Sequence, residues 1–227
     1  MSDNSCEKSL NIGTISHIVF DLDGTLIDTE LWGLNNANSV LAKYGKHCPL
    51  EHYSKLIGLD TLDRSQHLID DFELNGYDKN SFREEWVKEC MKTLTDIQLM
   101  PGVERLLDYL KKHDIPLAIA TSGKRLETLA KTNHLSHIFG EGKYFQHIIH
   151  GDDQRVKRDK PFPVIYQICI SEFKATPDPK NVLAFEDNSI GLSAAVSAGL
   201  TSVLVNDNRI LDVKESKADL SLILFSH

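Results

Sequence analysis

Short, largely apolar runs recur along the chain and are separated by longer segments in which apolar residues follow helical spacing. The runs lie at residues 18–20, 117–120, 147–149, 182–185, 203–205 and 220–224. Continuous apolar runs of this length are typical of strands buried on both faces, and their alternation with helices indicates a parallel sheet. We therefore predict an α/β fold, a doubly wound parallel-sheet core of the Rossmann-like kind.

One of the connecting segments shows the helical pattern clearly. Residues 102–112 place Val103, Leu106, Leu107 and Leu110 at helical spacing. The apolar stripe predicts an amphipathic helix that packs one face against the sheet.

The interval between residues 30 and 99 has a different pattern, with no convincing strand. Its helix-like segments lie at residues 34–44, 60–72 and 81–94. We predict an all-helical domain at 30–99, inserted into a core made of residues 1–29 and 100–227. The alternative is that these helices extend the helical layer of the core.

Two carboxylates stand directly after the first apolar run. Asp21 and Asp23 follow residues 18–20, and in an open parallel sheet the groups just beyond the carboxyl end of a strand form the ligand crevice. The pair could instead belong to an ordinary Asp-Gly turn or to a calcium-binding loop.

Composition and charge narrow the classes of partner. The chain has 227 residues, 41% hydrophobic and 26% charged, which are ordinary globular values, and a formal net charge of -8. This charge opposes nonspecific binding to nucleic acid or to an anionic membrane. In the basic cluster Arg155, Lys157, Arg158 and Lys160, we assign a site role to Lys160 alone. We expect neither a nucleic acid nor a membrane as partner, and a monomer.

The cysteines and the termini suggest an intracellular protein. Cys6, Cys48, Cys90 and Cys169 are widely separated and lack the spacing of a zinc site, so we expect free thiols. No apolar stretch approaches the roughly 18 residues of a membrane span, and residues 1–11 are too polar for a signal peptide. We expect a cytoplasmic protein with access to the nucleus.

Four short motifs occur in a fixed order and carry a family resemblance. They occupy residues 21–26, 119–123, 160–163 and 185–191. Together they resemble the motifs of the haloacid dehalogenase superfamily of phosphatases. Residues 99–102, 115–123, 151–153 and 185–187 are most similar to the pseudouridine-5'-phosphatase and phosphoglucomutase-like group, in which a helical cap is inserted between the first and second motifs.

The resemblance implies a covalent mechanism. Asp21 would attack phosphorus to form an aspartyl phosphate, and Asp23 would act as general acid and then as general base. An anionic nucleophile needs a cation to approach a phosphate ester, and Mg2+ prefers oxygen ligands. The implied ligands are Asp21, Asp187 and the main-chain carbonyl of Asp23, with Glu186 as a further candidate. Dehalogenases of the superfamily lack the second acid, which argues against dehalogenation.

Three residues are candidate phosphate ligands. Thr121 and Ser122 follow a predicted strand, where hydroxyl and amide donors can hold phosphate oxygens. Ser122 could equally cap the helix predicted at 124–131. Lys160 supplies a point charge, but Asp159 stands where the relatives often carry glycine, and an Asp159–Lys160 pair would weaken this role.

Other polar and aromatic residues near the first motif receive no site role. Asp28 and Glu30 are interpreted as loop or helix-entry charges. Trp32, Tyr53 and Trp86 could stack on a ligand, but we interpret them as packing residues.

The resemblance implies a small phosphorylated metabolite as partner, and three functional hypotheses remain. The first is a magnesium-dependent phosphatase for a small phosphomonoester, with pseudouridine 5'-phosphate as leading candidate and 2-deoxyglucose 6-phosphate or glycerol 3-phosphate as alternatives. The second is a β-phosphoglucomutase-like phosphotransferase. The third is a noncatalytic phosphate-ligand sensor, which would need neither nucleophile nor acid.

Overall fold

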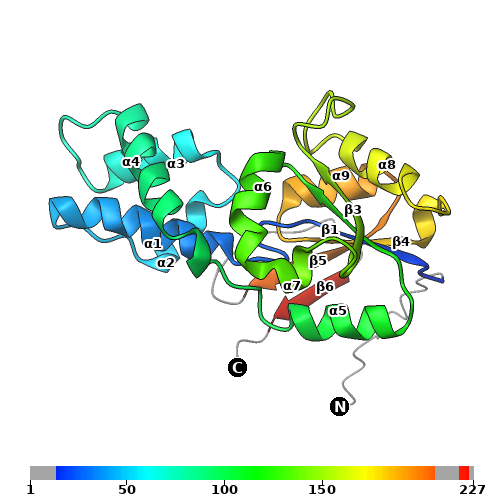
Figure 1. Cartoon of the computed structure of the whole chain (residues 1–227). Coiled ribbons are helices and arrows are strands. Elements are labelled where there is room, and N and C mark those ends of the chain that lie inside the picture. Colours follow the sequence, from blue (N-terminus) through cyan, green and yellow to red (C-terminus); the bar gives the residue numbers. More distant parts are fainter. Residues whose placement is uncertain (1–13, 208–219, 225–227) are drawn as a thin grey trace, which may run out of the picture.

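A sheet of six parallel strands forms the centre of the computed structural model, which describes residues 14–207 and 220–224 (Figure 1). The strands are β1 (His17–Phe20), β2 (Leu117–Thr121), β3 (Phe145–His150), β4 (Val182–Glu186), β5 (Thr201–Asp207) and β6 (Leu220–Leu224). Their order across the sheet is β3-β2-β1-β4-β5-β6. The predicted doubly wound α/β fold is confirmed.

The strand order places a topological switch point at β1. Phe20 of β1 pairs with Ile119 of β2 on one side and with Phe185 of β4 on the other. All residues of β2 are buried, as are three of the four in β1, which explains why these strands appear in the sequence as unbroken apolar runs. The residues that follow β1, β2 and β4 therefore emerge at one edge of the sheet.

Helices cover both faces of the sheet. They are α5 (Val103–Lys112), α6 (Arg125–Thr132), α7 (Ser136–Phe139), α8 (Val164–Ser171) and α9 (Ser189–Ser197). One apolar cluster joins α5 and α7 to side chains such as Phe20 and Ile119. A second cluster joins α8 and α9 to side chains of the opposite face, among them Val19 and Ala120. As predicted, α5 packs its apolar stripe on the sheet.

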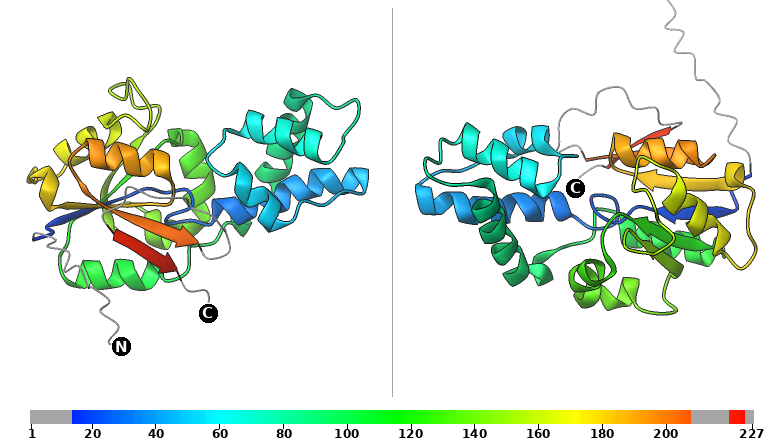
Figure 2. Two further views of the ribbon diagram at one scale, coloured as in Figure 1. Left: turned by 180° about the vertical axis from the view of Figure 1, so that it is seen from behind. Right: turned by 90° about the horizontal axis from the view of Figure 1, so that it is seen from above.

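The segment between β1 and α5 contains the remaining four helices and no strand. They are α1 (Thr29–Leu41), α2 (Leu50–Tyr53), α3 (Thr61–Asp71) and α4 (Lys79–Lys92), here called the helical insert. Their buried side chains form a separate cluster, with Tyr53, Phe82 and Trp86 at its centre. All three views show the insert to one side of the sheet (Figures 1 and 2).

Two short connections join the insert to the sheet. The amide of Asp28 donates to the carbonyl of Gln98 at 2.8 Å, and Ile27 forms an antiparallel bridge with Leu99. The entering and leaving chains thus run side by side.

Aspartate side chains fix where the helices of the insert begin. Asp60 accepts from the amides of Leu62 and Asp63 at the start of α3, and Asp78 caps α4 in the same way. The sequence analysis placed the start of α4 two residues late, at residue 81, because it did not use this cap. It also missed α2, which is only four residues long.

The described cysteines are free thiols, as predicted: Cys48 and Cys169 are buried and Cys90 is half-buried. Cys6 and the polar stretch at residues 1–11 lie outside the described residues. Within 14–207 and 220–224, no helix combines the length and the apolar character needed to cross a bilayer.

Candidate active site

Carboxylates from two adjacent strands meet at the carboxyl edge of the sheet. Asp21 follows β1, while Glu186 ends β4 and Asp187 follows it. The amide of Asp21 donates to the carbonyl of Phe185 at 2.9 Å, which holds the two strand ends in register. Each of the three carboxylates offers an oxygen, and these oxygens lie within 4.8 Å of one another.

Two glycines make room for this cluster. Gly24 has a φ of +81°, and a Cβ at this position would lie 2.2 Å from Oδ2 of Asp187. Gly191 lies against Glu186, where a Cβ would meet Oε2 at 2.0 Å. The neighbour that Gly191 accommodates is therefore the Glu186 carboxylate.

Lys160 is the cation of the cluster. Its Nζ donates to Asp21 Oδ1 at 2.6 Å, to Glu186 Oε1 at 2.7 Å and to the carbonyl of Ala120 at 3.0 Å. The side chain is only 6% exposed. The concern that Asp159 would pair with Lys160 was wrong: Asp159 is exposed, whereas the Lys160 ammonium is paired with Asp21 and Glu186 in the carboxylate cluster.

The cluster holds more negative charge than Lys160 balances. Burial raises the pKa of Asp21 to about 7 although Lys160 opposes the shift, and burial together with Asp21 and Glu186 raises the pKa of Asp187 well above its usual range. For Lys160, burial alone would lower the pKa, but the two carboxylates it contacts raise it above its ordinary value.

The donor set fits a hard divalent cation. Oε1 of Glu186 accepts from the buried hydroxyl of Tyr166 as well as from Lys160, whereas Oε2 is buried without a hydrogen-bond partner. A buried carboxylate oxygen without a partner, next to two carboxylates of raised pKa, is an arrangement that a bound cation would relieve. Its ligands would all be oxygens, which suits Mg2+ better than the softer metals.

The Asp23 side chain points to a different cation. Its Oδ1 accepts from Nζ of Lys131, on α6, at 2.7 Å. Burial opposes the charged form of Lys131, but the neighbouring carboxylates, Asp23 foremost, outweigh it, so the pKa of Lys131 is raised. The sequence analysis missed Lys131, because a basic residue near the end of a helix is the ordinary arrangement there.

Two of the three candidate phosphate ligands, Thr121 and Ser122, lie at the end of β2. Thr121 is buried and its Oγ1 accepts from the amide of Gly123 at 3.0 Å. Ser122 lines the cavity but does not cap α6, so the helix-cap alternative was wrong. Instead, the amide of Arg125 at the start of α6 is bound by Asp152 Oδ1 at 3.0 Å.

A cavity of about 230 Å³ lies over this cluster, and residues of the helical insert form part of its lining. The residues that line it come from the sheet edge (Asp21, Asp23, Thr121, Ser122, Gly123, Lys160, Asp187, Asn188 and Ile190) and from the insert (Glu30, Ile57, Gly58, Leu59 and Arg64). This volume suits a small metabolite rather than a macromolecule.

Asp28 and Glu30, both interpreted from the sequence as loop or helix-entry charges, have different roles in the structure. Asp28 caps α1 by accepting from the amide of Leu31 at 3.2 Å, as expected. Glu30 lines the cavity, where it is paired with Arg64 at 2.7 Å. The sequence analysis missed Arg64, because its approach to the site depends on how the helices of the insert are placed relative to the sheet edge.

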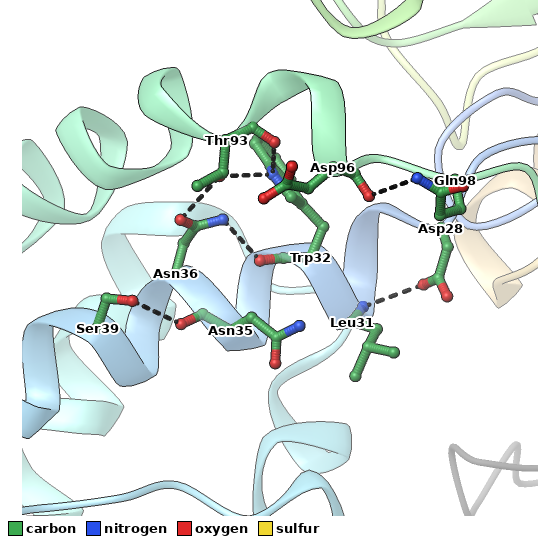
Figure 3. A pocket seen from close by; sticks show the side chains of 9 residues that line it. All are labelled: Asp28, Leu31, Trp32, Asn35, Asn36, Ser39, Thr93, Asp96 and Gln98. Atoms are coloured by element: carbon green, nitrogen blue, oxygen red, sulfur yellow. Dashed lines mark hydrogen bonds between the residues drawn. The ribbon is translucent and has the colours of Figure 1, made fainter. Parts of the chain in front are cut away.

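A second cavity, of about 300 Å³, lies beside α1 (Figure 3). Trp32 lines it, and its indole N–H donates to the carbonyl and hydroxyl of Thr93. Asp28 and Gln98, on the two connections to the sheet, lie at its end. Tyr53 and Trp86 are buried in the insert, so none of the three aromatic residues considered above lines the carboxylate cavity.

Comparisons with known proteins agree with this geometry. The family model described as haloacid dehalogenase-like hydrolase matches residues 18–205. The Drosophila melanogaster protein named "Probable pseudouridine-5'-phosphatase" is 33% identical over 206 residues, which are 90% of this chain and 87% of that protein. The Arabidopsis thaliana protein named (DL)-glycerol-3-phosphatase 1, mitochondrial is 32% identical over 203 residues, which are 87% of this chain and 66% of that protein.

A solved structure supports the same assignment. The β-phosphoglucomutase of Clostridium difficile superposes with a TM-score of 0.62 at 25% identity, covering 92% of this chain and 91% of that one. The doubly wound sheet with a carboxylate cluster at its carboxyl edge defines an α/β enzyme. The chain belongs to the haloacid dehalogenase-like hydrolases, and within them it is a phosphatase.

Proposed function

We propose that the protein is a magnesium-dependent phosphatase that hydrolyses a small phosphomonoester through an aspartyl phosphate on Asp21. The observation that carries the proposal is the meeting of Asp21, Glu186 and Asp187 with Lys160 at one edge of the sheet. A noncatalytic sensor of phosphate would have no use for a nucleophilic carboxylate with a second acid, Asp23, in the same cavity.

The metal ligands in this proposal are the carboxylates of Asp21 and Asp187, the main-chain carbonyl of Asp23 and, as a further ligand, Glu186. When bound, Mg2+ supplies the positive charge that lets an anionic nucleophile approach a phosphate ester. Lys160 donates to the Asp21 oxygen at 2.6 Å and so keeps that carboxylate fixed.

The chain's own residues then carry the proton and bond changes. An oxygen of Asp21 forms a bond to phosphorus while the bond to the ester oxygen breaks, and Asp23 donates its proton to that departing oxygen. Asp23 next takes a proton from water, which attacks phosphorus and releases phosphate and free Asp21. Thr121, Ser122 and Lys160 would hold the phosphoryl oxygens.

We further propose that the helical insert, residues 30–99, acts as a cap over a core of residues 1–29 and 100–227. The separate apolar cluster of the insert supports this division. So does its place in the cavity, where it contributes Glu30, Leu59 and Arg64 opposite the carboxylates. The cap would then contact and select the leaving group, while the core would bind the phosphate.

Pseudouridine 5'-phosphate is our leading candidate for the substrate, because a relative with that named activity aligns over nine tenths of this chain. Glycerol 3-phosphate is the second candidate, on the strength of the Arabidopsis relative. The likeness to a β-phosphoglucomutase makes phosphoryl transfer back to a sugar the alternative reaction.

The test is a panel of phosphorylated nucleosides, sugars and polyols, assayed with Mg2+ and with a chelator, on the wild type and on Asp21→Asn. We expect magnesium-dependent release of free phosphate by the wild type and none by Asp21→Asn. An isomeric hexose phosphate formed from a hexose 1-phosphate would indicate the mutase instead. Unaltered turnover by Asp21→Asn would overturn the covalent mechanism.

A further inference from the structure

The insert-side wall of the active-site cavity consists of Glu30, Ile57, Gly58, Leu59 and Arg64. The phosphoryl group belongs on the opposite side, against the carboxylates and Lys160, so this wall faces the leaving group. It contributes one carboxylate and one guanidinium to the cavity, together with two aliphatic side chains and a glycine.

The two charged side chains of the wall, Glu30 and Arg64, form an ion pair. Nη1 of Arg64 donates to Glu30 Oε2 at 2.7 Å and Nη2 donates to Oε1 at 3.2 Å, a two-pronged pairing. Nη1 also donates to the hydroxyl of Tyr53 at 3.0 Å, and Nε donates to the carbonyl of Leu59 at 2.9 Å. Four hydrogen bonds therefore engage all three guanidinium nitrogens.

The pair is also largely shielded from water. The side chains of Arg64 and Glu30 are 15% and 16% exposed. Four of the five guanidinium N–H donors are engaged, so an anionic group on the substrate would find a single N–H and would lie close to the Glu30 carboxylate. Hydroxyl groups meet no such obstacle, because each carboxylate oxygen of Glu30 still has acceptor capacity.

We propose that the Glu30–Arg64 pair is a specificity element, which restricts the enzyme to phosphomonoesters whose leaving group is uncharged and bears hydroxyl groups. This inference rests on the proposed phosphatase function and deepens it. Substrates that carry a carboxylate or a second phosphate on the leaving group are excluded, because the only cation on the wall is already neutralised.

The test compares two substrates that share a three-carbon frame. Glycerol 3-phosphate carries a terminal hydroxymethyl group where 3-phosphoglycerate carries a carboxylate. For the wild type we expect kcat/KM to favour glycerol 3-phosphate by about 100-fold, the scale of an unfavourable like-charge contact. In Glu30→Gln, which leaves Arg64 charged and unpaired, this ratio should fall at least about tenfold through a gain in kcat/KM for 3-phosphoglycerate.

A double variant distinguishes a role of the Glu30–Arg64 pair in substrate selectivity from a purely structural role in linking α1 to α3. Glu30→Gln with Arg64→Gln removes the ion pair but leaves the wall neutral, so the preference for glycerol 3-phosphate should return. Equal losses on both substrates in the single and the double variant would show that the pair is only a tether, and would overturn the inference. So would comparable turnover of both substrates by the wild type.

Failure of the proposed function gives a different result. Nitrophenyl phosphate has a reactive leaving group and makes small demands on the wall, so the wild type should hydrolyse it in the presence of Mg2+. If the wild type hydrolyses neither nitrophenyl phosphate nor any monoester of the panel, the phosphatase itself is refuted. If hydrolysis occurs without the expected preference, only the role of Glu30 and Arg64 is refuted.

Discussion

Replacing Tyr166 by phenylalanine tests whether the carboxylate cluster depends on support from behind the cavity. The Tyr166 hydroxyl is buried and donates to Oε1 of Glu186, and its ring lies 5.2 Å from Nζ of Lys160. Tyr166→Phe keeps the ring and removes only the hydroxyl. Burial, followed by Glu186, raises the pKa of Tyr166 well above its ordinary value, so the group lost is a neutral donor.

The expected cost follows from the charge of the acceptor. A hydrogen bond to a charged group contributes about 2 kcal/mol to the free energy of unfolding, and at this buried site water cannot replace the lost hydroxyl. For a chain of this size about 2 kcal/mol corresponds to a fall of roughly 4–8 °C in Tm. A residue that orients a metal ligand also affects metal binding, so the dissociation constant for Mg2+ should rise about tenfold.

The assay is thermal unfolding in the presence of a chelator, followed by a magnesium titration. Tyr109→Phe is the matched control, because that side chain is 60% exposed and should tolerate the same change with little effect. If Tyr166→Phe and Tyr109→Phe unfold at the same temperature and bind Mg2+ equally, the support attributed to Tyr166 does not exist.

Three further predictions concern other parts of the molecule. Lys131→Met should lower kcat for alkyl phosphates by about 10- to 100-fold, because Asp23 loses the ammonium 2.7 Å away that positions it; unchanged steady-state kinetics would contradict this. Asp60→Ala should lower the free energy of unfolding by about 1 kcal/mol, since it removes the cap of α3, and a denaturant titration checks it. Burial lowers the pKa of His147 in the folded state below its unfolded value near 6.5. The contribution of His147 to stability is therefore complete above pH 6.5 and is lost as the pH falls below it. The free energy of unfolding should differ less between pH 7 and pH 5 in His147→Gln than in the wild type, and an identical difference would count against this prediction.

The sequence predicted best the site residues whose position depends only on the strand that they end or follow. Asp21 and Asp187 each follow an apolar run, and parallel strands present their carboxyl ends at one edge, so their convergence could be expected without coordinates. Glu186 and Thr121 share that edge for the same reason. The family assignment came from the order of four motifs and is confirmed by the match over residues 18–205.

The features that were missed depend on how separate elements face one another. Lys131 contacts Asp23 across 108 positions of sequence, and its partner is set by the rotation of α6 about its axis. Arg64 on α3 contacts Glu30 in the first turn of α1 across 34 positions of sequence, so the pairing depends on how the helices of the insert pack together. Adjacency in sequence misled the interpretation of Asp159, since the Lys160 side chain runs into the core.

The central claim is that the Asp21 carboxylate attacks phosphorus, and trapping the acyl phosphate tests it most directly. Asp23→Asn should slow the second step, so this variant is mixed with nitrophenyl phosphate and Mg2+, quenched in acid and reduced with borohydride. Reduction of an aspartyl phosphate gives homoserine, which mass spectrometry of the peptide locates. We predict homoserine at position 21, and none when Mg2+ is replaced by a chelator. Phosphate release with residue 21 left as aspartate, or with the modification at another residue, would contradict the account.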